Sequence, residues 1–598
     1  MLAHKHITKI VAAVMAAAVC LCLCAVAFSG QLTAWVGDKG IAQEYETALF
    51  DTSSILSVNI QMDEADWNDM LENAMAETYY QCNVEVNGTM FYQVGIRPKG
   101  NTSLSAIAND DTTDRYSFKL EFDHYVDGQT CFGLDKLILN NNYADATNLK
   151  EALIYDMYQY LGADASLYNY AKISVNGEYW GVYLALEGVE DSFQLRNYGT
   201  ESGELYKPES MDMGGGKAQE RPDGMPEGTE DGKDFGDGGP PDAPNQTDAP
   251  NQTDAPNQTD APNQTDTPNQ TDAAENAEPG QRPEGAAEPP GGMDRNSGGA
   301  DLNYTDDDLD SYETIWDGEV TKTNQADHER VVKALKNIAA GNDLESYMDI
   351  DNLLRYMAVH VFSVNEDSLS GMMAHNYYLY ESDGKLSLIP WDYNLALGGM
   401  GGMGGGMPGG SGETEESSEA TSVVNSPIDD AFSGTDFFDT LLENETYHSQ
   451  YEAYLQQLVS EYINGGGFDA FYERVRSQID ELVETDPTAF YSYDEYETAA
   501  ETLYQVVKLR GQSIQGQLDA TIPSTEEAQR DSDALVDASD LDLSVMGTMN
   551  MGGGNGADGP GGPGGTGESD GAEPPQFGGN GQAPGKPQNS ENEEETEH

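Results

Sequence analysis

Hydrophobic and polar residues alternate along several short stretches in the first third of the chain. Alternation with a period of two is the pattern of a strand with one buried face. The predicted strands are residues 56–62, 80–86, 91–97, 116–122, 171–175 and 179–186. Asn87-Gly88 lies between two of them and Asn176-Gly177 between two others. Because Asn-Gly favours the backbone of a tight hairpin turn, we predict two hairpins here.

Two stretches among these strands have helical periodicity instead. Residues 63–74 place Trp67 and Leu71 on one face, which predicts a short helix. Residues 146–161 form a stronger amphipathic pattern, and it ends at Gly162, a residue type that commonly terminates helices. The mixture of hairpins and helices predicts an α+β fold.

The pattern after residue 310 is mainly helical. Helices are predicted at residues 329–340 and 344–361 and across much of 435–518. Asp383-Gly384 lies between two strand-like runs and predicts a third hairpin. Those two runs are residues 376–380 and 385–389.

Three long segments show neither the period of a strand nor that of a helix. Within residues 208–310 the unit Pro-Asn-Gln-Thr-Asp recurs every six residues from Pro244 to Pro268, and polar repeats with proline cannot bury a core. We therefore predict a disordered acidic insertion there. A Gly- and Met-rich stretch at 398–425 is predicted to be a flexible loop, and the acidic, Gly- and Pro-rich residues 521–598 a disordered tail. The two folded parts that remain are residues 45–207 and 311–520.

Acidic residues dominate the composition. The 598 residues include 29 Lys and Arg against 106 Asp and Glu, a formal net charge of −77. Binding to nucleic acid or to an anionic membrane surface needs clustered Lys and Arg. The charge therefore argues against a nucleic-acid partner. It also makes each basic residue of the folded parts a better candidate for binding phosphate.

Residues 1–30 have the pattern of an export signal. Two lysines precede an uncharged run at residues 10–28, and Ala-Val-Ala at 25–27 fits a small-residue cleavage site. The run is also long enough for a single membrane anchor, so a cleaved and an anchored form both stay open. In either form the rest of the chain is predicted to be exported and to meet the membrane only through this segment. Outside it, Cys82 and Cys131 either pair once or stay separate thiols.

Basic residues mark a first candidate site. The segment Gly-Ile-Arg-Pro-Lys-Gly-Asn-Thr-Ser at 95–103 could present backbone N–H groups, Arg97 and Lys99 to phosphate oxygens. Lys119 lies on the next predicted strand, and Glu151 on a predicted helix could hold it across a cleft. The alternatives are an ordinary hairpin turn, a solvated lysine and one more polar residue on a helix face.

Two carboxylates and an amide mark a second candidate site. Asn376 follows Asp367 by nine residues, and Asp392 follows the third hairpin at the end of an apolar run. Carboxylate and amide oxygens suit Mg²⁺ or Mn²⁺ that holds nucleotide phosphates. An Asp near a substrate hydroxyl can also accept its proton. The alternative is a helix-capping Asp and a turn Asp, although an unpaired carboxylate at the buried end of a strand is costly.

These segments, in this order, resemble the CotH family, the spore-coat protein H kinases. The resemblance spans about residues 50–207 and 310–520. It is carried by Arg-Pro-Lys-Gly-Asn-Thr-Ser at 97–103, Phe-Lys at 118–119, Val-Asn-Gly-Glu-Tyr-Trp-Gly-Val-Tyr at 175–183, Leu-Tyr-Lys at 205–207, His-Asn-Tyr-Tyr-Leu-Tyr at 375–380 and Pro-Trp-Asp at 390–392.

The resemblance implies an atypical, two-lobed protein-kinase-like fold that transfers the γ-phosphate of ATP to serine hydroxyls of proteins. It implies that Asp367 is the catalytic Asp that orients the acceptor hydroxyl. Asp392 would bind the metal, Mg²⁺ or Mn²⁺, with Asn376 as a second ligand. Lys119 would be the phosphate-binding strand lysine and Glu151 its helix partner.

Glu187 follows a strand where the connection between the lobes would lie, and it either contacts nucleotide or only stabilises a turn. The chain has no Gly-x-x-x-x-Gly-Lys-Ser/Thr segment and no His-Arg-Asp loop, so neither a P-loop ATPase nor an ordinary eukaryotic-type kinase fits. Two functions are open. One is a Ser/Thr kinase that acts on surface or coat proteins, or on its own acidic tails by autophosphorylation. The other is an exported surface binding or adhesion protein that keeps the kinase-like fold without phosphotransfer.

Overall fold

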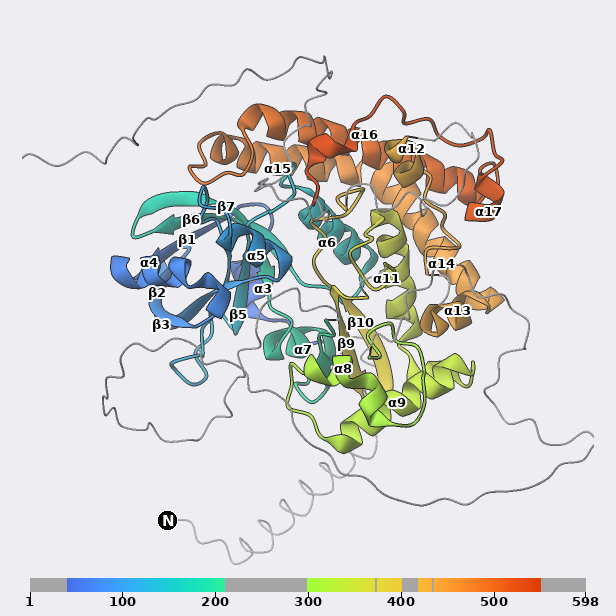
Figure 1. Cartoon of the computed structure of the whole chain (residues 1–598), viewed down its shortest axis with the longest axis horizontal. Helices are drawn as coiled ribbons and strands as arrows, with labels where there is room; N and C mark the ends of the chain where they lie inside the picture. The colour runs from blue at the N-terminus through green and yellow to red at the C-terminus, as the bar shows by residue number, and fades with distance from the viewer. Residues whose placement is uncertain (1–39, 210–297, 372–373, 401–417, 433–434, 550–598) are drawn as a thin grey trace, which may run out of the picture. The chain divides into compact units, whose positions relative to one another are not determined.

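The computed structural model describes residues 40–209, 298–371, 374–400, 418–432 and 435–549. The predicted leader, most of the predicted insertion and residues 550–598 lie outside these ranges. The described residues mix strands and helices, which confirms the predicted α+β class. Strands gather in the first part of the chain and helices in the second (Figure 1).

Seven strands close into a barrel in the first part of the chain (Figure 1). They are β1 (Leu56–Gln61), β2 (Tyr80–Val86), β3 (Thr89–Lys99), β4 (Ser117–Glu121), β5 (Lys136–Asn140), β6 (Tyr168–Val175) and β7 (Glu178–Glu187). They lie in the order β1-β2-β3-β4-β5-β7-β6, and a parallel pairing of β1 with β6 closes the ring. The other pairings in the ring are antiparallel.

All three predicted hairpins are confirmed. Both turn residues have positive φ in each: 49° and 82° at Asn87-Gly88, 52° and 87° at Asn176-Gly177, and 54° and 86° at Asp383-Gly384. Two positive φ angles in a two-residue loop match the twist of the flanking strands, and Asn, Asp and Gly adopt them at least cost. The third turn joins β9 (Tyr377–Ser382) to β10 (Lys385–Pro390), and β8 (Glu204–Tyr206) pairs with β9 in a separate sheet of order β10-β9-β8.

Helices cover the barrel and form most of the second part. In the first part they are α3 (Glu44–Ala48), α4 (Glu64–Glu72), η1 (Ala74–Ala76), α5 (Thr102–Ala108), α6 (Lys150–Leu161) and α7 (Asp191–Tyr198). In the second part they are η2 (Leu309–Tyr312), α8 (Glu313–Asp317), α9 (Gln325–Ala339), α10 (Leu344–Tyr347), α11 (Ile350–Ser363), α12 (Glu419–Val424), α13 (Asp436–Leu442), α14 (Glu445–Gln457), η3 (Leu458–Ile463), α15 (Gly467–Glu484), α16 (Tyr493–Leu518), α17 (Glu526–Gln529) and η4 (Leu543–Met546).

The predicted helix at 63–74 is confirmed as α4, which packs on the barrel core. The side chain of Asp63 caps its first turn by accepting a hydrogen bond from the backbone. The ring centroid of Trp67 lies 5.4 Å from that of Phe118 and 5.2 Å from that of Trp180. The alternating apolar residues of the strands therefore meet an aromatic helix face inside one core.

Helix α6 begins four residues later than its periodicity predicts. Asp145 accepts hydrogen bonds from the backbone N–H of Thr147 at 2.9 Å and of Lys150 at 3.1 Å. These bonds satisfy the N–H of Thr147, which precedes the helix, and that of Lys150, its first residue, and so compete with an earlier helix start. The later start places Glu151 in the first turn of α6, next to the end of β5.

The predicted helix at 344–361 is broken into α10 and α11. Met348 forms a parallel bridge with Leu386, and the backbone N–H of Asp349 donates to the carbonyl of Leu386 at 2.9 Å. An extended residue that pairs with β10 cannot also continue a helix, so the long-range pairing decides against local periodicity here.

All three segments predicted to lack structure are partly ordered. At the end of the predicted insertion at 208–310, Ala300 and Leu302 are buried. Within the predicted loop at 398–425, Met400 is buried and residues 419–424 form α12. The predicted disordered tail begins at residue 521, but η4 buries Leu543 and Met546. The N–H of Met549 then donates to the carbonyl of Gly399 at 2.9 Å. We call residues 535–549 the C-terminal strap.

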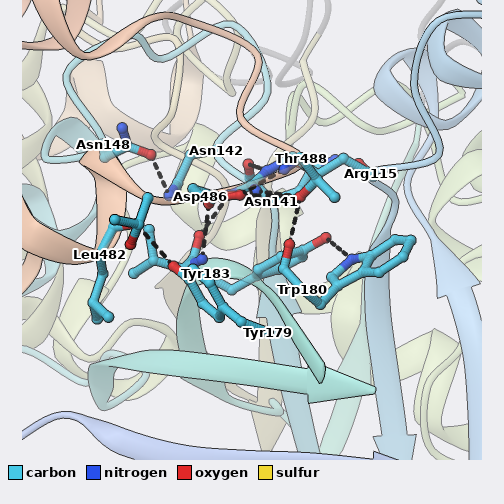
Figure 2. Close-up of polar contacts among 12 residues, drawn as sticks. Arg115, Asn141, Asn142, Asn148, Tyr179, Trp180, Tyr183, Leu482, Asp486 and Thr488 are labelled. Carbon is cyan, nitrogen blue, oxygen red and sulfur yellow. Dashed lines mark hydrogen bonds and ion pairs between the residues drawn. The ribbon is translucent and has the colours of Figure 1, made fainter. Parts of the chain in front are cut away.

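A buried ion pair joins the barrel to the connection between α15 and α16 (Figure 2). Arg115 Nη1 lies 2.7 Å from Asp486 Oδ2 and 2.8 Å from Thr488 Oγ1, and the side chains of the ion pair are 2% and 1% exposed. The Nε of Arg115 also donates to the carbonyl of Asn141 at 3.1 Å, and Asp486 accepts from the N–H of Val182 at 2.9 Å. Both charges are therefore hydrogen-bonded within the interior.

Two further observations bear on the sequence predictions. None of the helices in the described ranges has the length and hydrophobicity that spanning a membrane requires. Cys82 and Cys131 are both buried free thiols, so of the two alternatives the structure has separate thiols.

Candidate active site

The end of β3 and the start of α6 meet through a buried asparagine. Lys99 Nζ donates to Asn140 Oδ1 at 2.8 Å, and Asn140 Nδ2 donates to Glu151 Oε2 at 2.9 Å. Lys99 also lies over the ring of Trp391, with Nζ 5.4 Å from the centroid. Asn140 on β5 thus links Lys99 at the end of β3 to Glu151 in α6, and Lys99 also contacts Trp391, the residue before Asp392.

Burial perturbs the charged groups of this site. It lowers the pKa of Lys99, while Asp392 and Glu151 act in the opposite direction. Burial also raises the pKa of Glu151 to about 8, with the charge of Asp392 adding to the effect and the bond from Asn140 opposing it. Oε1 of Glu151 is buried and has no hydrogen-bond partner within the described residues. Such perturbed groups in a cluster are typical of functional sites.

Asp392 lies two residues after the end of the buried strand β10 and has φ 58°. Its carbonyl accepts a hydrogen bond from Asn365 Nδ2 at 3.2 Å, which holds the backbone. Its carboxylate has neither a hydrogen bond nor an ion pair with any residue the structure describes. Burial raises the pKa of Asp392, and the charges of Lys99 and Lys207 oppose that shift. A strained backbone beside a half-buried carboxylate without a partner is a feature of ligand sites.

Asp367 is held from both sides. Oδ1 lies 2.5 Å from Nε2 of His375, and Oδ2 accepts from Nδ2 of Asn376 at 3.0 Å. Nδ2 of Asn376 also donates to the carbonyl of Asp367 at 2.7 Å. His375 is not among the predicted site residues, although it stands in the His-Asn-Tyr-Tyr segment that carries the resemblance. In the structure His375 and Asn376 together orient Asp367.

The predicted metal ligands offer a suitable donor set. The amide NH₂ of Asn376 donates to Asp367, so its Oδ1 remains as an acceptor. Asp392 offers two carboxylate oxygens. Oxygen donors with one or two carboxylates are what Mg²⁺ and Mn²⁺ take when nucleotide phosphates supply the remaining ligands. Among the described residues there is no cluster of three or more His, Cys, Asp and Glu that could form a metal cage by itself. The residues therefore fit a metal shared with a phosphate ligand.

The expected pair of Lys119 and Glu151 is not formed. Lys119 Nζ lies 3.2 Å from Glu190 Oε1, and Lys136 Nζ lies 3.1 Å from Glu190 Oε2. Burial lowers the pKa of Lys119, and Glu190 partly offsets this. Glu151 is linked instead to Lys99, because Asn140 lies between them. The sequence could not show which lysine meets Glu151. Lys99 and Lys119 lie on neighbouring strands, and both follow apolar residues of their strands.

Glu187 has a structural environment. It is fully buried, and Arg196 Nε donates to its Oε1 at 2.9 Å. The hydroxyl of Tyr45 donates to Oε1 at 2.5 Å, and the N–H of Leu167 donates to Oε2 at 3.0 Å. Of the two predicted roles for Glu187, these contacts favour stabilisation of the connection after β7.

A hollow of about 400 Å³ opens beside Glu190. Its lining comprises Glu190, Asp191, Glu201, Ser202, Gly203, Glu204, Val320, Thr321 and Lys322. Four carboxylates make this hollow unfavourable for a triphosphate. Anionic ligand groups fit better beside Lys99 and Asp392.

The family comparison agrees with this arrangement. The family model described as CotH kinase protein matches residues 96–278 and 289–514, which is more than half of the chain. The match contains Lys99, Glu151, Asp367, Asn376 and Asp392. No curated protein matches the chain closely. The chain belongs to the CotH kinase protein family.

Proposed function

We propose that this protein is an ATP-dependent protein kinase that phosphorylates serine or threonine hydroxyls. The observation that carries the proposal is the convergence of two groups. Lys99 and Glu151 are joined through Asn140, and the oriented carboxylate of Asp367 and the unpaired one of Asp392 belong to the second part of the chain. The barrel and the helical part would correspond to the two lobes of a kinase-like fold.

The residues match the demands of phosphoryl transfer, which are positioning and neutralisation of charge. Asp367, fixed by His375 and Asn376, would hold the acceptor hydroxyl and take its proton. The acceptor oxygen forms a bond to the γ-phosphorus while the bond from that phosphorus to the β,γ-bridging oxygen breaks, and ADP leaves. Lys99 would neutralise phosphate charge. Asp392 and Asn376 would hold a divalent ion, which would shield the phosphates.

The substrate class and the place of action are part of the proposal. The export-like leader supports action outside the cytosol on surface or coat proteins. Ser and Thr residues of the chain's own acidic segments are further acceptors, by autophosphorylation. The strong negative charge argues against nucleic acid as a partner.

The test is transfer of labelled γ-phosphate by the full chain with Mg²⁺ or Mn²⁺. Asp367→Asn and Asp392→Asn should each lower the rate about 100-fold or more, because one removes the proton acceptor and the other a metal ligand. Both variants should stay folded, since Asp392→Asn removes an unpaired, half-buried charge and Asp367→Asn keeps a polar side chain of the same shape. The matched control is Asp307→Asn, an exposed carboxylate 67% accessible, which should leave the rate unchanged.

The outcomes separate the two functions. Label on the protein or on an added Ser-containing substrate that disappears in both variants would support the kinase. Absence of transfer together with absence of Mn²⁺-dependent ATP binding would exclude it. The chain would then be a kinase-shaped surface binding protein.

A further inference from the structure

A second lysine lies close to the candidate site, at the end of β8. β8 and β9 pair antiparallel, with Leu205 opposite Tyr380 and Tyr206 opposite Leu379. Continuing that register by one residue brings Lys207 opposite Tyr378. The ring of Tyr378 lies edge-on to Trp391, with centroids 5.3 Å apart. Lys207 therefore lies next to Tyr378, which contacts the same Trp391 ring that Lys99 covers.

The backbone of Lys207 is held by contacts with Gly318. Its N–H donates to the carbonyl of Gly318 at 2.7 Å. Gly318 packs so closely that a Cβ added there would collide with the carbonyl of Lys207. The residue before it, Tyr206, is fully buried. The side chain of Lys207 thus extends from a well-packed backbone at the end of β8.

Charges of the candidate site act on Lys207 and on its partner Glu209. Lys207 Nζ lies 2.6 Å from Glu209 Oε1, and the side chains are 30% and 43% exposed. Burial lowers the pKa of Lys207, but Glu209, Tyr378 and Asp392 together raise it above its ordinary value. Lys207 lowers the pKa of Glu209, and the charges of His375 and Lys99 act in the same direction. The carboxylate of Glu209 therefore lies in the field of three basic groups.

These surroundings distinguish the pair from an ordinary surface contact. Lys336 and Asp307 are also 2.6 Å apart, but they are 47% and 67% exposed and lie away from the site. Such exposed pairs contribute little to stability. Lys207 and Lys99 instead share Asp392 as a common neighbour, so two ammonium groups act on one carboxylate. In this structure Glu209 is the anionic group that pairs with Lys207.

We propose that Lys207 is a second phosphate-binding lysine beside Lys99, and that Glu209 holds its ammonium group until nucleotide phosphate replaces the carboxylate. The inference rests on the proposed function and adds a positioning charge to it. Phosphate oxygens carry more charge than one carboxylate, so exchange of the partner is favourable when ATP and metal are present. Glu209 competes with the phosphate for Lys207 and so weakens nucleotide binding.

Binding of Mn²⁺-ATP to the full chain, measured by isothermal titration calorimetry, tests this. Lys207→Met should weaken binding about tenfold or more, because a charge-assisted hydrogen bond to phosphate is lost. Glu209→Gln should strengthen binding a few-fold, because it frees Lys207. The two variants should therefore change the affinity in opposite directions. Damage to the fold would instead weaken binding in both. Lys336→Met and Asp307→Asn, the remote pair, should bind like the wild type.

The possible results point to different conclusions. Wild-type binding with no change in either variant would overturn the role of Lys207, and weakening by Glu209→Gln would overturn the role of Glu209. Lack of binding by the wild-type chain would instead be a failure of the proposed kinase function. If Lys207→Met did not fold, Glu209→Gln would still decide, because it changes only a half-exposed side chain that is not part of the core.

Discussion

At the scale of single residues, the most informative group is the Glu151 carboxyl. It is 3% exposed, its Oε1 lacks a partner among the described residues, and the charge of Asp392 acts on it. Asn140 and Lys99 favour its charged form, but burial outweighs them and raises the pKa to about 8. In the absence of ligands, Glu151 therefore carries a proton through neutral pH. A bound metal and Lys99 would favour its ionised form.

This protonation predicts how stability depends on pH. The folded state binds a proton on Glu151 up to about pH 8, whereas the unfolded chain releases it near the ordinary pKa of 4.5. The folded state then binds more protons in this window, so this group's contribution to stability falls as pH rises from about 4.5 to 8. Glu151→Gln should remove the dependence. In metal-free buffer the variant should gain several degrees of Tm relative to the wild type at pH 8.5 and little at pH 5.

The control for that measurement is Glu526→Gln, an exposed carboxylate 69% accessible that should give the same Tm difference at both pH values. An equal gain of Tm by Glu151→Gln at both pH values would contradict the predicted protonation.

At the scale of elements, the decisive contact is the clamp between Arg115 and the connection of α15 with α16 (Figure 2). Arg115 holds Asp486 and Thr488, and it also donates to the carbonyl of Asn141. Asn141 directly follows Asn140, the link between Lys99 and Glu151. The clamp thus fixes the start of the loop that leads from Asn140, at the end of β5, to Glu151 in α6.

Removing one partner of the clamp should be costly. Asp486→Ala leaves Arg115 buried and uncompensated, and such losses amount to about 3–5 kcal/mol. The expected result is a fall of that size in the free energy of unfolding, measured with urea on the full chain. The matched control is Glu526→Ala at the exposed pair of Arg530 and Glu526, which should change it by about 0.5 kcal/mol or less. A loss from Asp486→Ala as small as the control's would show that the ion pair contributes little.

At the scale of the whole chain, the C-terminal strap ties together segments that are far apart in sequence. Asn425, after α12, accepts from the N–H of Val536 and donates to its carbonyl. The carbonyl of Met546 accepts from the N–H of Ala146 at 3.0 Å, ahead of α6. With the bond from Met549 to Gly399, the strap braces both the loop before Glu151 and the segment that follows Asp392.

Truncation tests the strap. Ending the chain after residue 530 removes the buried side chains of Leu543 and Met546, and each such loss costs about 2–5 kcal/mol. We expect a markedly lower Tm and weaker Mn²⁺-ATP binding, because α6 loses its brace. Ending the chain after Met549 keeps every strap contact and should behave like the wild type in both measurements. Equal Tm values for the two truncated chains would exclude a stabilising strap.

Several parts of the structure could be predicted because their causes are local. Asn-Gly and Asp-Gly dictate the backbone of the three hairpins, and the period-two pattern dictates which side of β1 faces the core. The family resemblance also pointed to Asp367, Asn376 and Asp392 as one site, and the structure places Asn376 against Asp367. His375 lies within the recognised motif, but its contact with Asp367 depends on the path of the chain after α11.

The amino-acid sequence by itself determined the α+β class, the hairpins and the main helices, because these follow from backbone preferences and periodic burial. Only the tertiary structure decided which lysine meets Glu151. Lys99 and Lys119 look alike along the chain, and Asn140 and Glu190 separate them in space. It also decided that the tail folds back, since Leu543 and Met546 are isolated apolar residues whose burial depends on a surface made by distant segments. The local sequence pattern gives such residues equivalent prospects, and the packing of distant segments decides which of them make contact.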